Sequence, residues 1–190
     1  MYDVGYQPRC VATAEKLFNA IVALLDQGAS LDEITIVKLC NAAGVSRGSF
    51  YKHFDSLTDI FSWKIDQCMT QAFRGGGYLA EHDVGALTES FYYYWVAHSE
   101  LLDLLVSCKL FLLFNHGCRK GFKTFFGPII DKSDISDESK PYLVDLYASA
   151  ATSIMRVWLA RGKKESAERL ITISKHNNTL PTYKSDTEKP

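Results

Sequence analysis

The side chains best suited to chemistry stand together at residues 46–53, where one arginine, one lysine, one histidine and three hydroxyls share eight positions. The guanidinium of Arg47 can bond O6 and N7 of one guanine in the major groove of DNA. Hydroxyl, ammonium and imidazole groups suit phosphate oxygens, which fix register without reading sequence. Gly48 would let the backbone approach a duplex closely. The candidate DNA contacts are therefore Thr35, Ser46, Arg47, Gly48, Ser49, Tyr51, Lys52 and His53.

Other chemistries find weaker support in the sequence. His116 and Cys118 are close together, but zinc needs four convergent ligands, and no paired cysteines or H-E-x-x-H supply the rest. We therefore expect both residues in a loop or on the surface. A redox switch between Cys108 and Cys118 would need exposed sulfurs of low pKa, and Cys108 lies in an apolar segment. Gly75–Gly77 lacks the lysine of a phosphate loop. The string Gly44-Val-Ser-Arg-Gly48 has the spacing G-x-S-x-G, but it follows a predicted helix, whereas a nucleophile elbow follows a strand. The sequence predicts neither an enzyme nor a cofactor.

The elements that must position residues 46–53 have the spacing of a helix-turn-helix. A helix over 36–43 has Thr35 as its N-cap, Gly44 supplies a left-handed turn residue, and Ser46 begins a short third helix that ends near Phe54. Phe50 should point back into a small core, which Phe54 closes. Such a unit lays its second helix in the major groove. The alternative is a plain helical hairpin with a glycine turn.

The segment from Thr35 to Phe54 resembles the DNA-binding head of the TetR/AcrR family of bacterial transcription regulators. The string Ala43-Gly-Val-Ser-Arg-Gly-Ser-Phe-Tyr-Lys-His-Phe54 carries the resemblance, together with the residues that follow it, Asp55, Ser56, Ile60 and Phe61. A second patch, Trp158–Gly162 with Ser166, Glu168 and Leu170, is similar to the last helices of one branch of that family. The resemblance implies a DNA-binding head followed by a ligand-sensing and dimerising region.

One departure from the family weakens the expected contact with DNA. Leu57 stands where the family usually has a lysine that contacts a phosphate. Residues 1–65 also hold six basic against seven acidic side chains, so few counterions would be released on binding. We expect modest affinity that needs both heads of a dimer. The alternative is a head that keeps its fold but binds DNA weakly.

The rest of the chain predicts further helices and no strands. Periodic apolar residues favour helices over 11–25, 57–74, 141–160 and 164–175, and helical segments within 83–128 joined at His98-Ser99 and at Asn115–Gly117. Residues 131–139 read as a polar loop and Gly75–Gly77 as a hinge. The predicted fold class is all-α, with a head at 8–65, a second helical domain at 66–176 and a polar, frayed tail at 177–190.

Two features of the second domain suggest partners. Small and apolar residues on the helices near 141–160 and 164–175 would allow a four-helix contact between two copies, which the resemblance also implies; the alternative is burial within one chain. An apolar pocket for a small-molecule effector could be lined by aromatic residues that could equally form ordinary core: Phe91, Trp95, Phe111, Phe114, Phe122 and Tyr147.

Composition fits a protein that touches DNA through a small surface. The 190 residues carry a net charge of −1, whereas a protein that coats nucleic acid is strongly basic. Five widely spaced cysteines argue against a disulfide framework, and no apolar run or leader points to a membrane or to export, so we expect a cytoplasmic protein. Together these patterns predict a homodimeric, ligand-responsive transcription regulator, with repression the commoner sign in the family. The alternative is a co-regulator that binds another protein instead.

Overall fold

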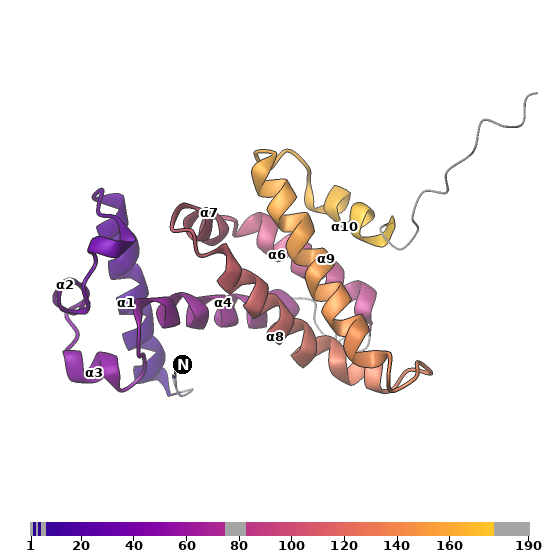
Figure 1. Ribbon diagram of the computed structural model, residues 1–190, viewed down its shortest axis with the longest axis horizontal. Helices are drawn as coiled ribbons and strands as arrows, with labels where there is room; N and C mark the ends of the chain where they lie inside the picture. The colour runs from indigo at the N-terminus through magenta and orange to yellow at the C-terminus, as the bar shows by residue number, and fades with distance from the viewer. Residues whose placement is uncertain (1, 3, 5–6, 75–82, 177–190) are drawn as a thin grey trace, which may run out of the picture.

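The computed structural model describes Tyr2, Val4 and residues 7–74 and 83–176, and throughout these residues the regular structure is helical (Figure 1). The all-α prediction is confirmed. The predicted hinge at Gly75–Gly77 and the predicted tail at 177–190 lie outside the described residues. No helix in the described part of the chain is long and apolar enough to cross a membrane.

The N-terminal helices form a small head around one long helix. This helix, α1 (Pro8–Asp26), starts with proline in its first turn, where the missing N–H costs nothing, and Gly28 follows its end at φ +92°. A 3₁₀ turn, η1 (Leu31–Glu33), leads to α2 (Ile36–Ala43) and α3 (Arg47–Tyr51). Leu17, Ile21, Leu39 and Phe50 are fully buried between these elements.

Helix α4 (Leu57–Arg74) connects the head to the rest of the molecule without a break. On the head side, its Phe61 ring lies edge-on to Phe18 of α1, with centroids 6.0 Å apart, and Lys64 Nζ lies 2.9 Å from Glu15 Oε1. Beyond this point α4 packs against α6 and α8. One helix thus crosses the predicted boundary at residues 65–66, which stays a prediction.

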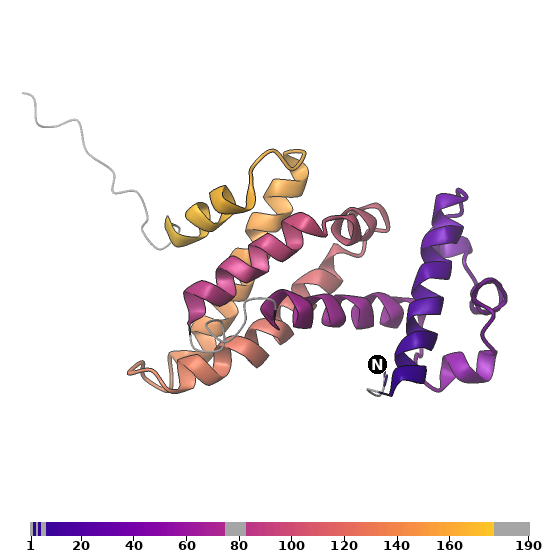
Figure 2. The ribbon, with the colours of Figure 1, turned by 180° about the vertical axis from the view of Figure 1, so that it is seen from behind.

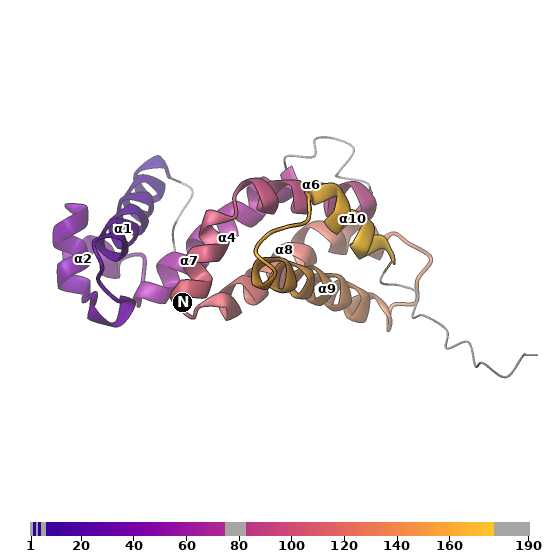
Figure 3. The same cartoon turned by 90° about the horizontal axis from the view of Figure 1, so that it is seen from above.

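The remaining helices form the second half of the molecule, in which α6 and α8 pack directly against α4. They are α6 (Val84–Ala97), α7 (Glu100–Ser107), α8 (Phe111–Asp131), α9 (Lys140–Ala160) and α10 (Ala167–His176). Helix α9 runs along α8, and α10 packs on α6 (Figures 2 and 3). The predicted junction at His98-Ser99 is confirmed, as is a polar loop before α9.

The junction predicted at Asn115–Gly117 is wrong, because α8 runs through it. Gly117 does not end a helix; it lies where α8 crosses α4, and a Cβ there would clash with Cγ2 of Ile65. One turn later a Cβ on Gly121 would lie 3.1 Å from the Phe73 ring. These two glycines allow the two helix backbones to approach closely.

Candidate nucleic-acid interface

The turn between α2 and α3 is built as the sequence predicts. Gly44 adopts φ +62°, and the N–H of Val45 donates to the carbonyl of Cys40 at 3.0 Å. This left-handed residue reverses the chain at little steric cost only because it is glycine. Cys40 is buried beside the turn, and Phe50 and Phe54 close the head core with centroids 6.0 Å apart. The turn therefore fixes how α3 projects from the head.

Two hydroxyls cap the helices of this unit. Thr35 Oγ1 accepts the N–H of Lys38 at 3.2 Å, and Ser46 Oγ accepts the N–H of Ser49 at 3.1 Å. The hydroxyls of Ser46 and Ser49 also lie 2.9 Å apart. Both N-cap predictions are confirmed, so the first turn of the five-residue α3 is held by its own side chains.

The outer face of α3 carries most of the candidate contacts. Arg47, Gly48, Ser49 and Lys52 are exposed, and Tyr51 is 50 % exposed with its ring edge-on to Phe50. A Cβ on Gly48 would meet nothing closer than Ser46 Oγ at 3.9 Å. Because no neighbour in the chain requires glycine there, the space over Gly48 is free for an approaching backbone.

The predicted outward position of His53 is wrong. Its side chain is 8 % exposed and its ring lies edge-on to Phe54. Helix α3 ends at Tyr51, and His53 N–H donates to the carbonyl of Phe50, three residues back. The chain has left the helix by then, so a helical projection no longer describes where residue 53 points.

The start of α4 contains a feature that the sequence reading missed. Asp59 accepts the N–H groups of Asp55 and Ser56 at 3.0 and 3.2 Å, while Ser56 Oγ accepts the N–H of Asp59 at 3.3 Å. This is a reciprocal cap, and the spacing Ser-x-x-Asp was visible as its signal. The backbone N–H groups of Asp55 and Ser56 therefore already have an acceptor and do not offer a hydrogen bond to a phosphate. The neighbouring side chain, Leu57, is apolar and offers none either.

A cavity of about 400 Å³ in the second half lies between α6, α8, α9 and α10. Of the predicted aromatic residues, Phe122 and Tyr147 line it. Lys175 at its edge pairs with Glu89 at 2.7 Å. Tyr92 also lines it, and burial raises the pKa of this phenol, which Ser174 hydrogen-bonds.

The other predicted aromatic residues lie in the core instead. Phe91, Trp95 and Phe114 are fully buried, with Trp95 and Phe114 edge-on at 4.8 Å, and Phe111 packs on Phe114 at 5.4 Å. None of these four residues lines the cavity at Phe122 and Tyr147. Ring-to-ring packing filled the space that a ligand would need.

The expectation for Cys118 is also wrong, since it is fully buried inside α8 and burial raises the pKa of its thiol. His116 is exposed on the same helix. Among the described residues, no three His, Cys, Asp or Glu side chains converge on a point that could hold a metal ion.

An apolar stripe on α9 lies open on the surface. Tyr142 and Leu146 are 79 % and 59 % exposed, and Val157 is 48 % exposed. Towards the end of α9 the stripe borders a groove of about 450 Å³ between α9 and α10, whose wall includes Trp158 and Leu170.

Comparison with known proteins identifies this second half. Residues 86–176, just under half of the chain, match the TetR_C_8 family model, described as a transcriptional regulator C-terminal region. The match starts within α6 and ends at the end of α10. A search of curated proteins gives no match.

Proposed function

We propose that this chain is a transcriptional regulator of the TetR family, whose C-terminal region it matches over residues 86–176, and that it acts as a homodimer that binds a near-palindromic DNA operator. The contacts come from the exposed side chains of α3, with Arg47 reading a base and Ser46, Ser49, Tyr51 and Lys52 meeting phosphates. Thr35 lies at the start of α2 as a further phosphate contact, and Gly48 allows close approach. The observation that carries this proposal is the exposed face of α3, capped at Ser46 and free of protein contacts over Gly48.

The operator is found by selecting bound duplexes from a random library, with Arg47→Ala as the test variant and Arg156→Ala as the control. Arg156 is an exposed arginine on α9, so its loss changes net charge equally. We expect a two-fold-symmetric site, bound about 5- to 150-fold more weakly by Arg47→Ala, since a bidentate base contact contributes about 1–3 kcal/mol. Equal enrichment by both variants would contradict the proposal.

We further propose that the cavity between α6, α8, α9 and α10 holds a small effector. Its aromatic and aliphatic walls at Phe122 and Tyr147, with a few hydroxyls and Lys175 at the edge, suit an apolar or aromatic molecule with one polar end. The fluorescent probe anilinonaphthalene sulfonate has this character. Thr88 of α6 lines this cavity and not the groove between α9 and α10. Saturable binding that Thr88→Phe abolishes, with an unchanged unfolding temperature, supports the site; binding unaltered by Thr88→Phe contradicts it.

The sign of regulation that we propose is repression, in the cytoplasm, with the effector releasing the operator. Run-off transcription from a template carrying the selected operator tests it. Less transcript with added protein supports repression, and more transcript contradicts it.

A second candidate is a co-regulator that keeps the fold but recruits another protein. The acidic cap at Asp59 and the apolar Leu57 favour it, because they remove phosphate contacts at the start of α4. The library selection separates the two: no enrichment by the unmodified protein favours the co-regulator.

A further inference from the structure

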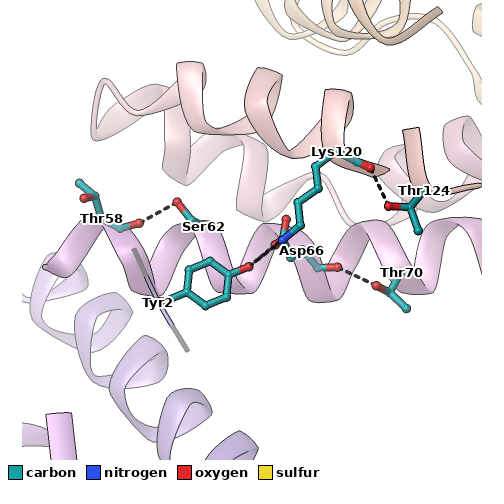
Figure 4. A network of polar contacts seen from close by, with 7 residues as sticks. All are labelled: Tyr2, Thr58, Ser62, Asp66, Thr70, Lys120 and Thr124. Atoms are coloured by element: carbon teal, nitrogen blue, oxygen red, sulfur yellow. Dashed lines mark hydrogen bonds and ion pairs between the residues drawn. The ribbon is translucent and has the colours of Figure 1, made fainter. Parts of the chain in front are cut away.

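The side chain of Tyr2 lies where three parts of the molecule meet. Its hydroxyl donates a hydrogen bond to Oδ2 of Asp66 on α4, and the same oxygen forms an ion pair with the ammonium group of Lys120 on α8. Lys120 Nζ also lies 3.5 Å from the Tyr2 hydroxyl oxygen. Figure 4 shows the tyrosine and the lysine converging on Asp66 from opposite elements.

The ring of Tyr2 makes two more contacts. Its centroid lies 6.3 Å from that of Phe54, which closes the head core behind α3. The Lys120 ammonium lies 5.5 Å from the centre of the Tyr2 ring, within the range of a cation–π contact. One side chain therefore touches the base of the helix-turn-helix, α4 and α8.

Neighbouring polar groups in the same view do not join these elements. Ser62, Thr70 and Thr124 each donate to the carbonyl four residues back in their own helix, at 3.1, 2.9 and 2.9 Å (Figure 4). In this view, the bonds between elements involve Tyr2, Asp66 and Lys120.

Lys120 is also close to the region that forms the cavity. Gly121 follows it at the tight crossing with α4, and Phe122 lines the cavity. A shift of α8 would therefore reach the head by two routes: the backbone crossing at Gly117 and Gly121, and the polar contact at Asp66.

We propose that Tyr2 is a positioning residue for operator binding: with Asp66 and Lys120 it fixes the angle between the head and α8. This inference rests on the proposed DNA-binding function. In a dimer, two heads held at a fixed angle fit one spacing of half-sites without further ordering on binding. We call the contacts among Tyr2, Asp66 and Lys120 the clamp. Without the clamp, the position of each head must become fixed on binding. This lowers the affinity for two half-sites together but not the affinity for one.

The test uses Tyr2→Phe, which keeps the ring on Phe54 and removes the hydroxyl, and Lys120→Met. Lys123→Met, an exposed lysine on the same helix, is the matched control. We expect Tyr2→Phe and Lys120→Met each to bind the selected operator about tenfold more weakly than the unmodified protein. Their affinity for a single half-site should stay within about twofold of the unmodified protein. Both variants should also tolerate one added base pair between the half-sites. The double variant should be no weaker than either single one. Equal losses on operator and half-site, or additive losses, would overturn the proposal.

A second measurement reads the clamp without DNA. Hydrogen exchange of the amides in α3 and in the first half of α4 should speed up in Tyr2→Phe and Lys120→Met but not in Lys123→Met. Unchanged exchange in the first two variants overturns the clamp. If exchange speeds up but the library selection yields no operator, the clamp stands and the DNA-binding proposal fails.

Discussion

At the residue scale, the head offers few free groups for the phosphate contacts that we propose. Of the head's six cations, Lys64 is paired with Glu15 at 2.9 Å. Asp59 occupies the amides of Asp55 and Ser56, and Leu57 carries no charge. Each missing contact lowers the electrostatic part of binding, which is the part that salt weakens.

Replacing Leu57 by lysine should therefore strengthen DNA binding. We expect Leu57→Lys to raise operator affinity several-fold and to make log Kd depend more steeply on log salt by about 0.9, the contribution of one further phosphate contact. Fluorescence anisotropy over a salt series measures both. Leu112→Lys, an exposed position on α8, is the control; an equal change in slope there would show a general effect of charge.

Residue-level prediction succeeded where local rules decide and failed where packing decides. The caps at Thr35 and Ser46 follow from hydroxyls at helix starts, and short-range hydrogen bonds determine them. His53 was misplaced because the end of α3 depends on how Phe50 and Phe54 pack. Whether Phe91 or Trp95 lined a cavity depended on rings distant in sequence, which no spacing reveals. What each exposed side chain of α3 contacts stays a prediction.

At the element scale, the crossing of α8 over α4 depends on the absence of a side chain at Gly117. We expect Gly117→Ala to destabilise the protein by about 1–3 kcal/mol, the usual cost of forcing a methyl group into a packed core. Urea unfolding measures this. Thr124→Ala on the exposed side of α8 removes a bond to its own helix and should change stability by less than about 0.5 kcal/mol.

The clash at Gly117 involves one methyl group of Ile65, so the cost should depend on that residue. Ile65→Leu moves this methyl away from Cβ while conserving volume. In that background Gly117→Ala should cost measurably less than in the unmodified protein. Additive costs would show that the strain at Gly117 arises elsewhere.

The exposed stripe on α9 makes a separate prediction about assembly. Val157→Glu places a charge in the groove between α9 and α10, and we expect it to convert a dimer into a monomer in sedimentation velocity. Leu112→Glu, on an exposed leucine of α8, should leave the dimer intact. If the unmodified protein sediments as a monomer, the proposed homodimer is contradicted.

Helix boundaries were predictable to different degrees. The ranges 36–43 and 57–74 agree with α2 and α4, because caps and apolar periodicity mark both ends. The predicted break inside α8 is wrong, because a glycine can mark either a helix end or a close crossing. The position of α4 decides between a helix end and a close crossing, and this position depends on tertiary packing that the local sequence does not reveal.

At the scale of the whole molecule, the buried side chains of the head and of the second half form one connected cluster through α4. We therefore expect a single unfolding transition. Helix content by circular dichroism should follow the same curve as tryptophan fluorescence, which reports on Trp63, Trp95 and Trp158. An early loss of helix before the fluorescence changes would show that the head unfolds on its own.

The unbroken course of α4 also has a mechanical consequence. From Ile65 at the crossing to Leu57 at its head end, the helix is about 12 Å long. A rotation of about 5° around the crossing would move that end by about 1 Å. Base recognition depends on hydrogen bonds that hold only over a few tenths of an ångström. A rotation of α4 too small to alter the packing of the second half would therefore be enough to move α3 out of hydrogen-bonding distance of the bases that we propose it reads.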